Sequence, residues 1–223
     1  MTILIAFIGL LNLNSGNSFF QSTEQTVDMT NKKTIVLDQL EGDVEIRQSS
    51  DSNVVIKTES ELKERSGWGL QFYKTYLTGY SISSSDSAAE LKLFPAQREK
   101  SDLKFMVGSA PKEFVKNIIY IPSHVIVVIK KESGKITVDG NYKGVVIESE
   151  NCEIAISAES KTIKYFSAFS SSSDRIFVVK PAAENLTELG TKETKNKFIK
   201  YLGTGDSIYS IMSDRGNIAI QFN

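Results

Sequence analysis

The stretch Ser133-Gly134-Lys135-Ile136-Thr137-Val138-Asp139-Gly140 decides the fold of this chain. Its glycine tolerates a positive φ and can therefore form a corner. The alternation that follows sends Ile136 and Val138 to one face of a strand and their polar neighbours to the other. Each such unit is expected to form a corner and a half-buried β-strand.

The same unit recurs along the chain. Complete copies are Gly42-Asp43-Val44-Glu45-Ile46 and Gly216-Asn217-Ile218-Ala219-Ile220. In Gly144-Val145-Val146-Ile147 the unit is one residue out of phase, and in Cys152-Glu153-Ile154-Ala155-Ile156 cysteine stands where glycine would stand. Strands this short bury their apolar face by stacking on one another, which is the logic of solenoids. The predicted corner residues are Gly42, Gly134, Gly144, Cys152 and Gly216.

Short runs of β-forming residues, separated by Gly, Asn, Asp or Ser, continue to the end of the sequence, and helical periodicity is almost absent. This pattern predicts an all-β fold. We expect an irregular β-solenoid or β-roll of stacked short strands, with a β-sandwich as the alternative. The pattern loosens between residues 59 and 114, which predicts a long insertion into a single domain of residues 19–223.

The insertion contains an aromatic cluster. It holds the single tryptophan, Trp68, together with Tyr73 and Tyr76. Exposed aromatic rings often grip ligands, so the cluster is a candidate ligand-contact site. The alternative, which we favour, is that these rings cover one open end of the stacked strands, as the terminal caps of repeat proteins do.

The N-terminus carries an apolar run from Ile3 to Leu13 that is too short to span a bilayer. Its length suits a secretory signal peptide, and Gly16 and Ser18 supply small residues before a cut at Phe19. No Lys or Arg precedes the run, so a buried first strand or an upstream start site are the alternatives. Residues 1–18 are predicted to be a signal peptide, and the protein is predicted to reach the periplasm, the cell surface or the medium.

Charge and residue content argue against several mechanisms. The 26 Lys and Arg residues nearly balance the 27 Asp and Glu residues, so no net field favours nucleic acid. One cysteine, Cys152, and one histidine, His124, cannot form an intrachain disulfide or the usual zinc site. The sequence contains no Gly-x-Ser-x-Gly elbow, and no later apolar run reaches the roughly 20 residues that span a membrane. We expect no catalytic residue, cofactor or metal.

The segment from Asn117 to Ser157 resembles a bacterial adhesin-like family of unknown function found in envelope proteins. The shared pattern is a strand that ends in Pro122, a strand from Val125 to Lys130, and successive Ser-Gly-x-Ile/Val-x-Val units. The resemblance leaves the insertion unmatched, and Cys152 departs from the motif. It implies a β-solenoid-like fold and an envelope location, with no established active site.

These observations favour a non-enzymatic exported envelope or cell-surface domain. It would act as a scaffold or adhesin-like binding module, with an envelope protein or a surface glycan as its partner. One alternative is a polysaccharide-acting enzyme, which needs two carboxylates about 5 to 10 Å apart in a groove. The acids that stacking could bring together are Asp43, Glu45, Glu148 and Glu153. Another alternative is an envelope signalling protein that docks its partner by strand addition.

Overall fold

The computed structural model describes residues 5–6, 18–63, 81–96, 112–171, 176–179, 191–194, 197–202 and 204–223. Within these ranges the protein is all-β, with one 3-10 turn, η2 (Ser160–Thr162), and no α-helix. The predicted all-β class is therefore confirmed. None of the residues described belongs to a helix that could cross a membrane. The aromatic cluster of Trp68, Tyr73 and Tyr76 lies outside these ranges.

Sixteen strands join into one hydrogen-bonded network. In chain order they are β1 (Ile5–Ala6), β2 (Ser18–Asp28), β3 (Thr34–Asp38), β4 (Asp43–Ser49), β5 (Asn53–Lys63), β6 (Ile82–Asp86), β7 (Glu90–Pro95), β8 (Lys112–Pro122), β9 (Ile126–Asp139), β10 (Gly144–Ala158), β11 (Ile163–Ser170), β12 (Ile176–Val179), β13 (Thr191–Thr194), β14 (Lys197–Tyr201), β15 (Ser207–Arg215) and β16 (Ile218–Phe222).

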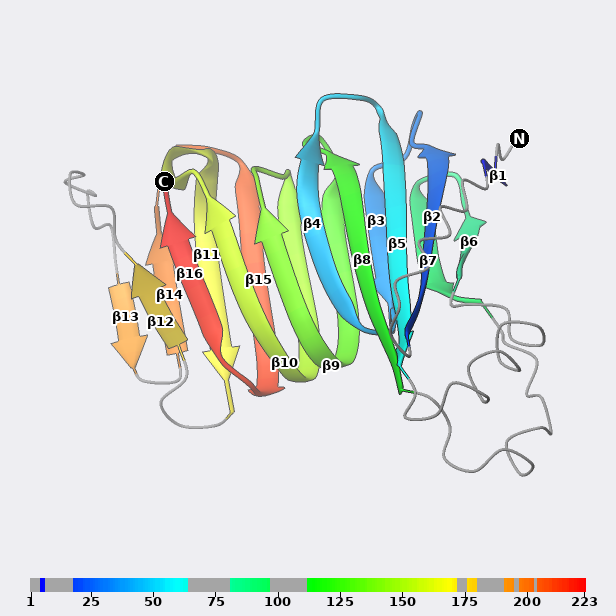
Figure 1. Ribbon diagram of the computed structural model, residues 1–223. Helices are drawn as coiled ribbons and strands as arrows, with labels where there is room; N and C mark the ends of the chain where they lie inside the picture. The colour runs from blue at the N-terminus through cyan, green and yellow to red at the C-terminus, as the bar shows by residue number, and fades with distance from the viewer. Residues whose placement is uncertain are drawn as a thin grey trace.

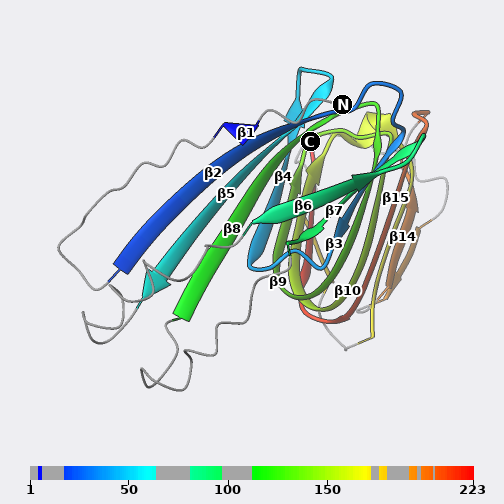
Figure 2. The ribbon, with the colours of Figure 1, turned by 90° about the vertical axis from the view of Figure 1, so that its right-hand side faces the viewer.

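The central strands wind into coils, and each coil contributes to two layers. Residues 126–131 of β9 pair in parallel with β3 and with residues 144–149 of β10. Residues 133–139 of β9 belong to the other layer, where they pair with β4 and with residues 151–157 of β10. We call the layer of β3 the first face and the layer of β4 the second face. Figure 2 shows β9 and β10 bending from one layer into the other.

Each face has a parallel centre and an antiparallel flank. The first face runs from β7 and β3 through the first halves of β9 and β10 to β15, β11, β14 and β13. The second face runs from β2, β5, β8 and β4 through the second halves of β9 and β10 to β16 and β12. Figure 1 shows these strands stacked side by side along the length of the molecule.

The order of the coils departs from the chain order. A simple solenoid stacks its coils in sequence, as β3–β4, β9 and β10 do here. The coil of β15 and β16 follows β11 and β12 in the chain, yet it lies between them and β10. Stacked parallel coils therefore follow the predicted repeat logic, whereas the connectivity is not that of a simple solenoid.

The core consists of in-register rows of aliphatic side chains that fill the space between the two faces. Alternation along each strand sends every second residue inward, and parallel pairing places like positions beside one another. The buried rows of the first face are Ile35, Val127, Val145, Tyr209 and Phe166, and Leu37, Ile129, Ile147, Ile211 and Ala168. Those of the second face are Val44, Ile136, Ile154 and Ile218, and Ile46, Val138, Ile156 and Ile220.

The structure differs from the prediction in the bounds of the insertion and in the presence of strand β2. β5 continues to Lys63 and β8 begins at Lys112, so the loosened segment is shorter than 59–114. Within it, β6 and β7 form a hairpin, and β7 extends the first face beside β3. β2 pairs with β5 along its whole length. The sequence did not predict this strand because a strand with few apolar residues lacks the usual hydrophobic alternation.

Candidate functional site

Four of the predicted corner residues form one column across neighbouring coils. Cys152 pairs directly with Gly134, and the registers on either side bring Gly42 next to Gly134 and Gly216 next to Cys152. The three glycines have φ values of 68°, 112° and 123° for Gly42, Gly134 and Gly216, respectively. Their corners turn the chain from the first face into the second face.

Close backbone contact requires glycine at two positions of this column. A Cβ atom on Gly42 would lie 1.9 Å from the carbonyl oxygen of Val115. A Cβ atom on Gly216 would lie 1.9 Å from the carbonyl oxygen of Cys152. Both positions combine a left-handed φ with a neighbouring backbone that leaves no room for a side chain, which is the reason a glycine stands there.

Cys152 occupies the equivalent corner of its coil, where the neighbouring coils have glycine. It is not among the residues of positive φ, and its thiol is completely buried inside the corner. The Sγ atom donates a hydrogen bond to the carbonyl oxygen of Lys131 at 3.7 Å. Burial raises the pKa of the thiol, against the smaller opposing effect of Lys131. A buried thiol that stays protonated is a packing group rather than a nucleophile.

Gly144 is not a corner residue, contrary to the prediction. It begins β10, pairs with Ile126 and Ile208 in the first face, and lacks a positive φ. The positive φ in this part of the chain belongs to Gly140 at 124°. The repeat unit that contains Gly144 is therefore a first-face strand, which explains why it is one residue out of phase.

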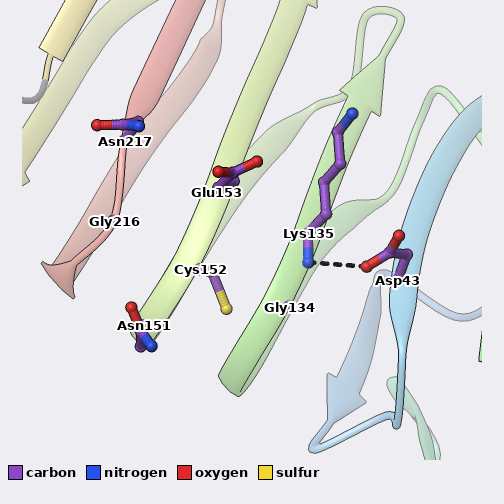
Figure 3. A pocket seen from close by; sticks show the side chains of 8 residues that line it. All are labelled: Asp43, Gly134, Lys135, Asn151, Cys152, Glu153, Gly216 and Asn217. Carbon is purple, nitrogen blue, oxygen red and sulfur yellow. Dashed lines mark hydrogen bonds between the residues drawn. The ribbon is translucent and has the colours of Figure 1, made fainter.

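The column opens a shallow groove on the second face with a volume of about 440 Å³. Its floor is formed by Gly134, Cys152 and Gly216, where short side chains leave space. The polar side chains that line it come from neighbouring strands and are those of Asp43, Lys135, Asn151, Glu153 and Asn217. Figure 3 shows four of them side by side, each one residue after its corner position. We call this feature the corner groove.

Charges alternate along the corner groove. From β4 to β16 the row reads Asp43, Lys135, Glu153 and Asn217. Lys135 on β9 therefore lies between the two strands that carry the carboxylates. The Lys135 backbone N–H also donates to Oδ1 of Asp43 at 3.1 Å (Figure 3). Opposite charges on neighbouring strands stabilise one another. The row offers a ligand both donors and acceptors over about 14 Å, the span of four strands.

A buried lysine lies behind the groove. Lys131 is only 4% exposed, and its Nζ donates a hydrogen bond to the carbonyl oxygen of Leu40 in the turn before β4. Burial lowers the pKa of this ammonium group, partly offset by Cys152 and by the carboxylates of Asp43 and Glu41. Lys131 holds the corner by satisfying a turn carbonyl that strand pairing leaves open.

The sequence contained a signal for Lys131 that our prediction did not use. Val127 and Ile129 point inward, so alternation along β9 sends Lys131 inward as well. The preceding residue, Lys130, points outward, and its Nζ atom lies 3.6 Å from Oε2 of Glu148. Two adjacent lysines on one strand therefore have opposite environments.

The opposite corner, between the second face of β9 and the first face of β10, is closed by tyrosines. The Tyr142 backbone N–H donates to the hydroxyl of Tyr209 at 3.0 Å, and the Tyr142 hydroxyl donates to the Asp139 carbonyl oxygen at 3.1 Å. Burial raises the pKa of Tyr209 to about 12, and it raises the pKa of Tyr142 further. One corner of the coil is thus open to solvent, and the other is filled.

Two of the four acids considered for catalysis lie in one groove. Asp43 and Glu153 both line it, with Lys135 on the strand between them. Glu45 forms ion pairs with Lys116 at 2.9 Å and with Arg47, and hydrogen bonds from these cations lower its pKa although burial acts in the opposite sense. Glu148 lies on the first face. Asp43 and Glu153 are both exposed, so neither has the apolar surroundings of the general acid in a glycosidase.

The single histidine lies away from the groove. His124 is exposed in the turn between β8 and β9, at the other end of the first-face strand from Gly134. Among the residues that the structure describes, no three His, Cys, Asp or Glu side chains form a group that could hold a metal ion. The groove therefore offers hydrogen bonds and fixed charges to a ligand.

Fold and groove together define an all-β protein of stacked parallel coils with a polar corner. No protein-family model and no curated protein match the chain. One similar solved structure is a candidate cell adhesion protein from Clostridium sporogenes, with 12% identity, a TM-score of 0.47, and coverage of 92% of this chain and 100% of that one. Another is a candidate lipid-binding protein from Parabacteroides distasonis, with 12% identity, a TM-score of 0.24, and coverage of 94% and 98%. Neither likeness is close enough to support an argument about function.

Proposed function

We propose that this protein is an exported, non-enzymatic binding module of the cell envelope, adhesin-like in character, whose corner groove contacts a surface glycan. The observation that carries the proposal is the corner groove itself. Polar side chains from four neighbouring strands line a depression whose floor is formed by Gly134, Cys152 and Gly216. A concave site with a few fixed polar groups is the usual form of a ligand site.

The chemistry of the groove supports a ligand rich in hydroxyl groups. Asn151 and Asn217 each offer an amide that donates and accepts, and Asp43 and Glu153 accept further hydrogen bonds. Lys135 compensates part of the negative charge, so the groove has no strong preference for a charged ligand. Because the lining contains no aromatic side chain among the residues that the structure describes, we expect weak binding that gains strength through several copies at a surface.

A rigid framework supports binding rather than catalysis. The groove is built on strands whose inward rows are fully buried, so its side chains project from positions that packing fixes. The thiol that lies nearest is buried and protonated, and the two carboxylates are exposed. A binding role requires no more than these groups supply.

Export is tested by expressing the full chain in its native host, fractionating the cells and determining the mature N-terminus by mass spectrometry. We expect a cut near Ser18 and recovery from the envelope, the cell surface or the medium. An intact Met1 in the cytoplasmic fraction would overturn export, and the adhesin-like proposal would fall with it.

Glycan contact is tested with purified protein on an array of surface polysaccharides. Asn151→Ala combined with Asn217→Ala should abolish the signal, because it removes both amides from the groove. Gln221→Ala is the matched control, since Gln221 is exposed on β16, the strand that directly follows Asn217, and is not among the residues that line the groove. Equal loss in both variants, or no glycan signal with the wild-type protein presented in multivalent form, would contradict this assignment.

A further inference from the structure

The outward side of the first face is unusually rich in apolar residues. At its centre, where a surface sheet normally carries polar residues, aliphatic and aromatic side chains point to solvent. They are Val36, Ile126, Val128, Val146, Tyr165, Phe169, Ile199, Ile208 and Met212. We call this set the apolar patch.

The strand registers place most of the apolar patch in neighbouring positions. One outward row crosses β3, β9 and β10 as Val36, Val128 and Val146, and then reaches Ser210 and Ser167, whose hydroxyls hydrogen-bond to each other at 3.4 Å. In the next row, Gly144 separates Ile126 from Ile208 and has no side chain of its own, and a Cβ built on it would lie 3.5 Å from Ile126. The patch therefore surrounds one small hydroxyl pair.

The patch is most exposed over β15 and β11. Ile208 is 52% exposed, Met212 is 53% exposed and Phe169 is 40% exposed. Met212 and Phe169 are direct neighbours in the parallel ladder. Half of the six large exposed hydrophobic side chains within the described ranges thus gather on two adjacent strands. Contiguous patches of this kind mark interaction surfaces.

Four of the charges at the rim of the patch form two ion pairs. Lys92 pairs with Asp38 at 2.6 Å, and Lys130 pairs with Glu148 at 3.6 Å, while Lys197 lies beside Phe169. Paired charges attract anionic lipid or nucleic acid only weakly, and they do not repel an identical surface. The chemistry of the patch therefore fits a flat, neutral, apolar partner.

We propose that the apolar patch docks onto the apolar patch of a second copy of this chain, related by a two-fold axis near Val146 and Ser210. The outward side of six strands about 4.8 Å apart, each with three outward residues about 6.6 Å apart, spans roughly 500 Å² per copy, and the apolar patch supplies half of these positions. The total of about 1,000 Å² reaches the lower limit of specific interfaces. The dimer is therefore reversible and depends on concentration. This inference goes beyond the proposed glycan contact and does not rest on it.

A dimer of this form places the second faces on the outside. The second face carries Glu45, Arg47 and Lys135 outward, charged groups whose burial would be costly. Two copies joined through their first faces would therefore present two corner grooves on opposite sides. Such a dimer is bivalent.

The association is tested by sedimentation equilibrium of the purified chain over a concentration series from micromolar to near millimolar. We expect the dimer fraction to rise with concentration. Ile208→Lys combined with Met212→Lys should weaken dimerisation at least tenfold. Ala219→Lys combined with Gln221→Lys adds the same charge to exposed second-face positions of β16 and should leave dimerisation unchanged. Unchanged near-ultraviolet circular dichroism shows that each variant is folded.

Geometry is tested separately with a bismaleimide cross-linker. Cys152 is buried, so Ser210→Cys supplies an accessible thiol at the centre of the patch, and the two thiols of a dimer should be joined. Ala219→Cys on the second face should not give a cross-linked dimer. A wild-type protein that is monomeric throughout, equal weakening by both lysine pairs, or a monomer that binds neutral phosphatidylcholine vesicles through the patch would overturn the proposal.

Discussion

The two faces of the stack have similar inward-pointing side chains and different outward-pointing side chains. Inward rows of both faces consist mainly of Val, Ile and Leu in register, with Tyr209, Phe166 and Ala168 on β15 and β11 of the first face. Outward rows differ, since β9 alone presents Ile126 and Val128 on the first face and Lys135 and Thr137 on the second. The inward positions have to fill the core, whereas the outward positions are not constrained by folding. The difference on the outside is therefore where evidence about partners is found.

The largest expected effect is that truncating a buried side chain destabilises the protein equally on the two faces. Ile147 and Ile156 lie on the same strand, one on each face, and both are buried at 1% and 2% exposure. Truncating either to Ala should lower the free energy of unfolding by about 2–5 kcal/mol through lost burial and an unfilled cavity. Urea unfolding of the two variants measures this. A cost confined to one face would mean that the two inward rows are not equivalent.

The corner that separates the faces provides the second test. Gly134→Ala should cost about 1–3 kcal/mol, because its φ is 112° and its Cβ would lie 2.9 Å from the Gly42 carbonyl oxygen. Gly144→Ala is the matched control. It has no left-handed φ, and its Cβ would lie 3.2 Å from the Ile208 carbonyl oxygen, a tight contact that a small shift relieves, so we expect a smaller cost than at Gly134. Thermal melts that rank the two variants in the opposite order would refute the corner assignment.

The buried lysine behind the corner predicts a pH dependence. Because burial lowers the pKa of Lys131 in the folded state, the unfolded chain binds more protons between that lowered value and 10.5. The free energy of unfolding therefore increases as the pH rises through this window. The total increase is about 1.4 kcal/mol for each pH unit by which burial lowers the pKa of Lys131. Lys131→Met should remove this gain.

Urea unfolding between pH 7 and 9.5 measures the effect of Lys131, with Lys135→Met as the control for loss of an exposed charge on the same strand. The upper limit matters. The raised pKa of Tyr209 and Tyr142 in the folded state means that their stabilising contribution is lost above pH 10, which would mask the lysine. Parallel pH profiles of wild type and Lys131→Met would show that Lys131 is not desolvated.

The smallest effects are expected on the outside of β9. Val128→Thr on the first face should cost less than about 1 kcal/mol, and Thr137→Val on the second face should gain a similar amount, because both positions are half-exposed. Dilute protein has to be used so that dimerisation does not contribute. A cost of several kcal/mol for Val128→Thr would show that Val128 is buried in the core rather than outward.

Much of the coil could be predicted from the repeat unit. Gly42, Gly134 and Gly216 stand at corners because only a residue without a Cβ atom fits their φ and contacts. The charged row of the groove follows from the same unit, since Asp43, Lys135, Glu153 and Asn217 each come directly after a corner position. Local sequence reveals these features because a glycine followed by alternating residues repeats at these corners, although the backbone contacts that exclude a side chain at Gly42 and Gly216 come from distant strands.

Other features depend on contacts that a local pattern does not encode. The run Val125 to Ile129 is continuously apolar, which is typical of a strand buried on both sides, yet its outward side is part of the apolar patch. β2 has no apolar periodicity and forms by pairing with β5. The place of Trp68, Tyr73 and Tyr76 lies outside the described ranges and stays a prediction.

The position of β15 and β16 between β10 and β11 governs the order of folding. Among the described strands, β11 and β12 join the central stack only through this later pair. A growing chain can align β3, β4, β9 and β10 as each is synthesised, but the stack has a missing layer until residues 207–222 exist. Pairing across such a long loop is slow. The coil of β15 and β16 therefore acts as a keystone, because β11 and β12 have no parallel neighbour in the described part of the stack until it is in place.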